Sequence, residues 1–379
     1  MRNTQLPISP RAEVSSIYPF PSPNQREHEQ SASHSLSRSV ASTSARGNVS
    51  RFIGDMNPEG IFLAATSPQD LRGGPLDGDV GVWLIQHCKE AGSNPSQLRR
   101  APPGSLFHEY TPAIQQVFLP ILERDCLTTL PSVDHRQALL SVYFQKFHPI
   151  FPMVNQPMYD TLPEQSASRA LLEQGMCLVA SADASSKHCL LLEDDGDPLA
   201  RRDFGKRVLA AMRVSIETGM VTDKIILVQA LGLMALFVEG REGSEVSSLM
   251  VARAVHHLHS LGLHMQDREE NSVLDHGQTL FCCIWTIDRL NAASQGRPVI
   301  MHERDTGRSL RQCFDAQKPA FRLLLHVVES LDLVIGLYRP GNTGTESNHD
   351  FCLFEDLVVE CGASHVSTDQ LGESARLLM

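Results

Sequence analysis

Residues 140–159 read LSVYFQKFHPIFPMVNQPMY, and this stretch says more about the fold than any other part of the chain. Apolar residues recur at helical spacing from Leu139 to Phe147, which predicts a helix with one broad buried face. Pro149 ends that helix, because proline has no amide hydrogen to donate and restricts the residue before it. We expect an aromatic turn after the helix, in which Phe147 and Phe151 fill a core.

His148 lies within this turn and allows two interpretations. A functional histidine would act here as a ligand or a proton carrier. A structural histidine would bond to backbone carbonyl groups at the helix end while the neighbouring phenylalanines pack inward. The position beside a proline, between two aromatic residues, favours the structural interpretation.

A second informative stretch, residues 287–298, reads IDRLNAASQGRP. Asp288 and Arg289 are adjacent, and adjacent residues do not face each other on a helix, so we expect each to find a separate partner. A buried guanidinium would join two helices, and Gly296 would end the helix and turn the chain. Arg297 could instead receive a small anionic molecule, although the sequence supplies no second polar group that converges with it.

Together the two stretches resemble the regulatory middle region of fungal transcription factors of the zinc binuclear cluster class. The first family motif combines a tyrosine-phenylalanine pair with a phenylalanine-histidine-proline-x-phenylalanine-proline turn, and it is matched by Tyr143, Phe144, Phe147, His148, Pro149, Phe151 and Pro152. The second motif has an aspartate-arginine pair and ends on glycine-arginine-proline; Asp288, Arg289, Gly296, Arg297 and Pro298 match it, with Trp285 near a family tryptophan. The resemblance covers roughly residues 130–340, with a further similar string at residues 51–63.

The resemblance implies a nuclear regulator of transcription that acts through the transcription machinery or related regulators, with a small-molecule effector as a further partner. The DNA-binding module of that class needs six closely spaced cysteines to bridge two zinc ions. The first of the nine cysteines here is Cys88, and no Cys-x-x-Cys occurs. We therefore expect no cofactor in this chain, and DNA contact only through an upstream zinc cluster or a partner. The alternative is a co-regulator or dominant inhibitor of full-length relatives.

Composition supports a protein that does not bind DNA directly. The formal net charge is -11, whereas nucleic-acid binders carry a basic face that replaces phosphate counterions. The longest apolar run, residues 225–238, is shorter than the ~20 residues that a bilayer requires, so we expect no membrane partner.

The sequence predicts three regions. Residues 1–50 contain twelve serines and five prolines and are expected to form a disordered leader. Residues 51–110 are expected to be a linker with short elements, including one helix near residues 80–90. Residues 111–379 are expected to form an all-α, multi-helix globular regulatory domain, incomplete at its C-terminus.

Several helix boundaries follow from capping residues. Thr111 and Pro112 favour a helix start, Asp134 and Asp197 are expected to cap two later helices, and Gly262 is expected to end another in a left-handed conformation. Residues 224–238 are apolar on all sides, which predicts the central buried helix.

Two clusters invite metal or catalytic hypotheses. His-x-x-His spacing alone is a weak sign of a metal site, and no carboxylate stands at a matching offset for the cluster His256, His257, His259 and His264. The string EDDGD at residues 193–197 is similar to the magnesium motif of terpene cyclases, but its spacing differs and no second metal motif follows. An all-α Mg²⁺-dependent enzyme therefore stays a remote alternative. Because the chain has no nucleophile elbow, P-loop or dinucleotide fingerprint, we predict no catalytic residue, no metal ligand and no enzymatic activity.

Overall fold

The computed structural model describes residues 49–54, 81–86, 112–193, 196–238, 240–265, 274–337 and 352–366. All of them lie in one compact unit, residues 47–379. The predicted leader lies outside the described residues, except for Val49 and Ser50, and so does most of the predicted linker.

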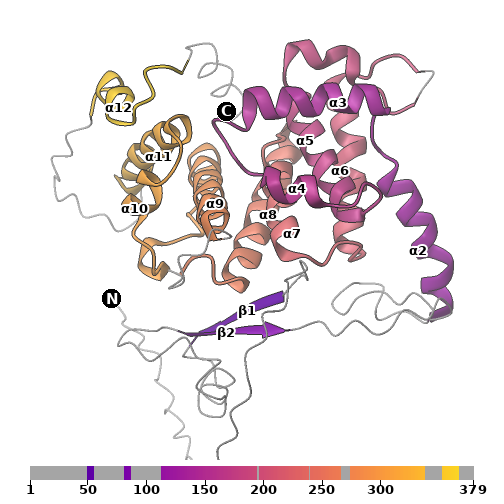
Figure 1. Ribbon diagram of the computed structural model, residues 1–379, viewed down its shortest axis with the longest axis horizontal. Helices are drawn as coiled ribbons and strands as arrows, with labels where there is room; N and C mark the ends of the chain where they lie inside the picture. The colour runs from indigo at the N-terminus through magenta and orange to yellow at the C-terminus, as the bar shows by residue number, and fades with distance from the viewer. Residues whose placement is uncertain are drawn as a thin grey trace, which may run out of the picture. The chain divides into compact units, whose positions relative to one another are not determined.

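The described part of this unit is built almost entirely from helices, as the sequence predicted (Figure 1). The α-helices are α2 (Pro112–Leu127), α3 (Val133–Val142), α4 (Gln156–Thr161), α5 (Ala167–Ala180), α6 (Arg201–Glu217), α7 (Lys224–Ala235), α8 (Gly240–Ser260), α9 (Leu274–Gln295), α10 (Leu310–Asp315), α11 (Pro319–Leu337) and α12 (Phe354–Glu360). One π-helical turn, η3 (Tyr143–Phe147), continues α3, and two short 3₁₀ turns are η4 (Ala184–Cys189) and η5 (Glu303–Asp305).

The helix predicted near residues 80–90 is wrong. Strand β2 (Gly81–Gln86) occupies that position and pairs antiparallel with β1 (Val49–Gly54), with Phe52 opposite Trp83. The run GVWLIQ is short and contains β-branched and aromatic residues, which fit a pleated strand better than a helix.

Two predicted caps are also wrong, while the predicted glycine stop is confirmed. Ser132 occupies the cap position of α3, which places Asp134 in the first turn. Helix α6 begins at Arg201, after the cap residue Ala200, so Asp197 lies outside it. An aspartate is favourable anywhere near a helix N-terminus, so composition alone does not fix which residue caps. Gly262 has a φ of 71° and ends α8 in the left-handed conformation.

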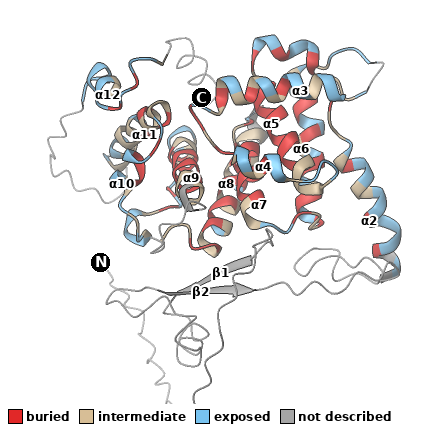
Figure 2. Cartoon of the chain, in the orientation of Figure 1, coloured by how far each residue is buried: buried red, intermediate tan, exposed pale blue. Residues whose placement is uncertain are grey.

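Helix α7 is the centre of the core. It packs against α5, α8 and α9, and its residues from Ile226 to Ala235 are buried (Figure 2). Its cap is Asp223, whose carboxylate accepts hydrogen bonds from the amides of Ile225 and Ile226 at 2.8 and 3.2 Å. A helix that is apolar all round must be covered on every side, and the neighbouring helices provide that cover.

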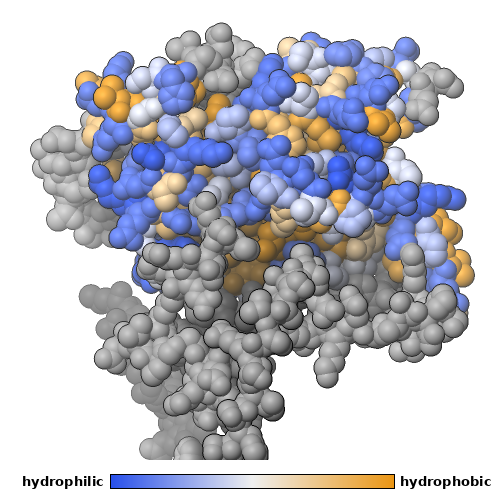
Figure 3. Space-filling model, viewed as in Figure 1, coloured by the Kyte–Doolittle hydropathy of each residue, from blue (hydrophilic) through white to orange (hydrophobic). Residues whose placement is uncertain are grey.

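The remaining helices extend this core. Helix α9 packs against α8 and α11, and α10 packs against α9 and α11. Hydrophilic side chains cover most of the described surface in Figure 3, but an apolar strip follows the outer side of α2, where Val117, Phe118 and Ile121 are exposed. Within the described ranges, no helix combines the length and apolar character that spanning a membrane requires.

Candidate functional site

The first motif forms the end of α3. The amide of His148 donates to the carbonyl of Tyr143 at 2.9 Å, which widens the last turn into the π-helix η3. Phe147 and Phe151 are both buried, and the ring of Phe151 meets Phe321 of α11 edge to face with centroids 5.9 Å apart. The two phenylalanines therefore lie in the core, as the pattern of the turn predicts.

The side chain of His148 forms a hydrogen bond across this turn. Its Nε2 lies 2.8 Å from the carbonyl oxygen of Val154 and donates to it, since a carbonyl can only accept. Burial lowers the pKa of His148, the bond to Val154 opposes that effect, and the positive charge of Lys318 adds to it. The geometry is that of a structural histidine, although the carbonyl lies after the helix end rather than within the helix.

The other residues of the first motif pack around this ring. Tyr143 is buried, and Phe144 lies between the rings of His148 and Tyr159, at centroid distances of 5.4 and 6.0 Å. Pro149 and Pro152 belong to the turn that leads away from η3. The motif therefore forms a cluster of packed aromatic side chains in the segment that joins α3 to α4.

The second motif corrects one expectation. Asp288 and Arg289 pair with each other: Nη1 of Arg289 donates to Oδ2 of Asp288 at 3.0 Å, and both side chains are almost fully buried. The long arginine side chain reaches its neighbour although the two Cβ atoms point in different directions. The Asp288 carboxylate also accepts the amides of Ile300 and Met301 at 3.0 and 2.9 Å, and burial raises its pKa against these favourable contacts.

Arg289 also joins two helices. Its Nε donates to Asp332 of α11 at 3.2 Å, and its guanidinium lies 4.7 Å from the centroid of the Trp285 ring. The ring of Trp285 in turn packs on Phe314 of α10, at a centroid distance of 5.0 Å. The expected connection between helices through this guanidinium is therefore present.

The glycine-arginine-proline end of the motif turns the chain after α9. Gly296 has a φ of 62°, a conformation that other residues adopt with strain. Arg297 is partly exposed and forms an ion pair with Glu245 of α8, so its guanidinium has a carboxylate partner within the protein. Pro298 follows directly and cannot continue the helix.

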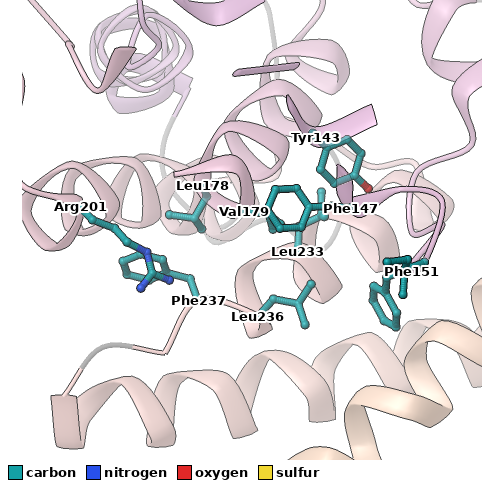
Figure 4. Close-up of a pocket in the computed structure, with 10 residues that line it drawn as sticks. Tyr143, Phe147, Phe151, Leu178, Val179, Arg201, Leu233, Leu236 and Phe237 are labelled. Atoms are coloured by element: carbon teal, nitrogen blue, oxygen red, sulfur yellow. The ribbon is translucent and has the colours of Figure 1, made fainter. Parts of the chain in front are cut away.

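A pocket lies against the first motif, and sequence reasoning did not predict it. Tyr143, Phe147 and Phe151 form part of its wall, and α5 and α7 add aliphatic side chains, among them Val179 and Leu233 (Figure 4). The pocket is shallow and mostly filled by its own walls: the space in it that is open to the centre of a water-sized molecule is about 20 Å³, and most of its lining residues are buried.

One charged residue lines this pocket. It is Arg201, at the start of α6, whose guanidinium lies 5.2 Å from the centroid of the Phe237 ring. In Figure 4, Arg201 and Phe237 lie at one end of the pocket and Phe151 at the other. The sequence carries no signal that would have linked Arg201 to the turn, because the two are brought together only by the packing of α6 against the core.

The histidine cluster lies at the end of α8. The rings of His259 and His264 have centroids 4.6 Å apart, and burial lowers the pKa of both His257 and His264 to about 4. Over the described ranges, no three histidine, cysteine or acidic side chains lie close enough together to hold a metal ion.

The described residues of the acidic string, Glu193, Gly196 and Asp197, are exposed. Glu193 forms an exposed ion pair with Arg207, while residues 194 and 195 lie outside the described ranges. Cys282 and Cys283 are both fully buried in α9.

Comparison with known proteins gives a consistent result. Residues 140–317 match the family model of the fungal specific transcription factor domain. An ABC-transporter-regulating transcription factor of Aspergillus fumigatus is 27% identical over 195 residues, which are 50% of this chain and 22% of that protein. Cutinase transcription factor 1 beta of Fusarium vanettenii is 25% identical over 186 residues, 47% of this chain and 20% of that protein.

The chain thus spans only about a fifth of the length of these curated relatives. No solved structure gives a significant match. Both sequence motifs lie inside the matched range, and their buried members are Tyr143, Phe147, Phe151, Trp285, Asp288 and Arg289. Residues 140–317 thus match the fungal specific transcription factor domain, and the relatives that the chain resembles are fungal transcription factors.

Proposed function

We propose that this protein regulates transcription in a fungus through a helical regulatory domain that acts in the nucleus. The observation that carries this proposal is the family match over residues 140–317, which coincides with the core built around α7 and α9. The relatives are named as transcription factors, which supports a non-enzymatic role.

Contacts with other proteins are the proposed mode of action. The net charge of -11 opposes direct binding to the DNA backbone. A zinc cluster, in an upstream module or in a related regulator, would supply the DNA contact. The transcription machinery and related regulators are the proposed partners, and the role of a co-regulator for longer relatives remains a prediction.

A tethering experiment tests this function. The whole chain is fused to a heterologous DNA-binding module in a fungal reporter strain whose basal expression is intermediate, so that activation and repression are both visible. We expect the fusion to change reporter expression relative to the module alone. A fusion that is stable and nuclear but leaves expression unchanged would contradict the proposal.

A pair of variants shows whether the effect needs the folded domain. Arg289→Met removes a buried guanidinium and is expected to abolish the reporter response. Arg202→Gln removes an exposed arginine of α6 and is expected to preserve it. A fluorescent fusion of the unmodified chain tests the nuclear location separately.

A further inference from the structure

We propose that Cys282 of α9 and Cys313 of α10 form an oxidation-sensitive dithiol, which a hydroperoxide converts into a disulfide. Both cysteines are free and buried, and neither belongs to the two sequence motifs. This inference goes beyond the proposed function, because it assigns a modification site whose chemistry can be measured on the purified chain without any transcriptional readout.

The two thiols meet at the interface between α9 and α10, which pack against each other (Figure 1). The thiol of Cys282 is hydrogen-bonded to the sulfur of Cys313. A disulfide forms readily only between cysteines whose side chains already approach each other, because its geometry tolerates little displacement. The direct contact between the two thiols therefore meets the first requirement for a reversible bond.

Contacts on both sides of the dithiol hold Cys313 in position. The side chain of Gln317 donates to the carbonyl oxygen of Cys313 at 3.0 Å, and its own oxygen accepts a hydrogen bond from Thr279 of α9 at 2.9 Å. Further along α9, the ring of Trp285 packs on Phe314 of α10 with centroids 5.0 Å apart. These contacts bracket the dithiol and fix the separation of the two helices where the sulfur atoms meet.

Cys313 is the thiol that would react first. Gln278 and Arg308 hydrogen-bond to its sulfur in addition to Cys282. Arg308 also donates from Nε to the carbonyl oxygen of Leu263 at 2.7 Å, which orients its guanidinium. The bond from Cys282 lowers the pKa of Cys313, burial opposes it, and the positive charge of Arg308 lowers it further. Because the thiolate is the nucleophilic form of cysteine, these donors activate Cys313.

The activated sulfur lies close below the surface. Cys313 is 3% exposed, and the adjoining side chains of Gln278 and Arg308 are partly exposed. A molecule as small as hydrogen peroxide therefore has only a short distance to travel from solvent to this thiol.

Cys283 provides the contrast within the same helix. It is fully buried, and burial raises its pKa with no opposing contact. Burial also raises the pKa of Cys282, which therefore keeps its proton and can donate it to Cys313. Adjacent residues of a helix point in different directions, so only one of the two neighbouring cysteines faces Cys313.

The oxidation proceeds in two balanced steps. The Cys313 thiolate attacks one oxygen of hydrogen peroxide: an S–O bond forms, the O–O bond breaks, and the departing hydroxide takes up a proton to become water. Cys313 is then a sulfenic acid. The sulfur of Cys282 attacks it: the S–S bond forms, the S–O bond breaks, and the proton of Cys282 leaves with the hydroxide as a second water. The two thiols together lose two electrons, and one peroxide gains them.

The disulfide would change the contact between the two helices. A covalent S–S bond is shorter than the hydrogen bond that it replaces, so oxidation would draw α10 toward α9 and alter the packing of Phe314 on Trp285. Disulfides that form in nuclear or cytosolic proteins are usually transient and serve catalysis or redox sensing. A reversible bond at this interface fits a sensing role.

Peroxide treatment followed by peptide mapping tests the proposal. The purified whole chain is reduced, freed of reductant and treated with hydrogen peroxide near neutral pH, and the remaining thiols are alkylated. We expect mass spectrometry of the digested protein to show two peptides joined through Cys282 and Cys313, which dithiothreitol separates. Cys352 is exposed and serves as an internal reference, and the thiol of Cys313 should be lost before that of Cys352.

Three variants separate the roles of the residues. Cys283→Ala is the matched control and should still form the disulfide. Cys282→Ala should form none and should accumulate a sulfenic acid at Cys313, which dimedone traps. Arg308→Gln should slow the loss of the Cys313 thiol by about threefold or more, because a smaller thiolate fraction outweighs the higher nucleophilicity of the remaining thiolate. Circular dichroism verifies that each variant is folded, and Cys282→Ser replaces Cys282→Ala if the latter does not fold.

Three outcomes would overturn the proposal. Oxidation of Cys352 while Cys313 stays reduced would show that the buried thiol is not activated. A disulfide at Cys313 that persists in Cys282→Ala would show that a different thiol is its partner. An unchanged rate in Arg308→Gln would show that the guanidinium does not stabilise the thiolate. Each of these outcomes leaves the proposed function standing, because the tethered reporter tests that function separately.

Discussion

Asp288 and Arg289 are neighbours on α9 and form an ion pair with each other. Asp288 also binds the segment after α9, and Arg289 also binds α11. The carboxylate of Asp288 holds the amides of Ile300 and Met301, so it fixes the segment that follows the turn at Gly296. The guanidinium of Arg289 reaches Asp332 and thereby fixes α11. One buried ion pair therefore sets the direction of the chain after α9 and the position of α11 beside it.

Replacing this arginine should strongly destabilise the domain. Arg289→Met leaves the Asp288 carboxylate buried without its charged partner, and losing one member of a buried pair costs about 3–5 kcal/mol. Urea unfolding followed by circular dichroism measures this loss. Arg297→Gln is the matched control, because its ion pair with Glu245 is solvent-exposed and should contribute little. Equal losses in the two variants would contradict the assigned role of the buried pair.

The aromatic turn should behave as part of the core. Phe147→Ala removes a buried ring and is expected to lower the free energy of unfolding by about 3–5 kcal/mol. Phe118→Ala, which removes a ring that is 52% exposed on α2, should have a much smaller effect. Thermal melting of both variants provides the comparison, and an unchanged melting curve for Phe147→Ala would argue against the placement of the turn.

Stability should fall in mild acid, and His276 should account for part of the loss. Burial lowers the pKa of His276 to about 4, with the positive charge of His148 adding to the effect. The unfolded chain binds the proton near pH 6.5, whereas the folded protein binds it only near pH 4, so stability is lost as the pH falls between these values.

The contribution of His276 to the pH dependence of stability can be measured separately from that of the other histidines. Between pH 7 and pH 5 it amounts to about 2 kcal/mol. His276→Gln cannot be protonated, so its unfolding free energy should fall by that much less over the same interval. Other partly buried histidines whose pKa is lowered, such as His257, contribute a loss that both proteins share. Identical pH dependence in the two proteins would show that His276 is not shielded from protonation.

Two glycine substitutions should have opposite effects. Gly205→Ala places a Cβ atom 2.0 Å from the ring of Phe237 and is expected to cost roughly 1–3 kcal/mol, because the ring must move. Gly336→Ala, in α11, meets no atom within 4 Å and should stabilise the protein by roughly 0.5–1 kcal/mol through higher helix propensity. Differential scanning calorimetry distinguishes the two, and a Gly205→Ala variant as stable as the unmodified protein would count against the described packing of Phe237 on α6.

The purified chain should not retard duplex DNA at physiological salt. Its net charge of -11 gives repulsion from the phosphate backbone, and the described residues contain no site for a metal cluster. A gel-shift titration at two salt concentrations tests this expectation. Specific retardation that weakens steeply with salt would show that the chain carries its own DNA-binding surface.

The sequence was most predictive where a local pattern has a single physical solution. The segment after Asp223 is apolar on all sides, so it is stable in water only when other helices cover it. Helix α7 is buried as expected. Gly262 fits a left-handed stop because it lacks a Cβ atom, and it is found in that conformation. The predicted helix at residues 80–90 was wrong because a short apolar run fits either element until its pairing with β1 is known.

What the sequence by itself determined is therefore the helical class of the domain, its central helix and the two motifs that lie inside the matched range. Helical periodicity and helix-breaking residues act over a few positions, so both can be recognised directly in the sequence. Only the tertiary structure decided that Arg289 binds both Asp288 and Asp332, and that Arg201 lines a pocket with Phe147. These relationships depend on how distant helices pack, because a buried charge or ring takes the partners that the surrounding core places within reach.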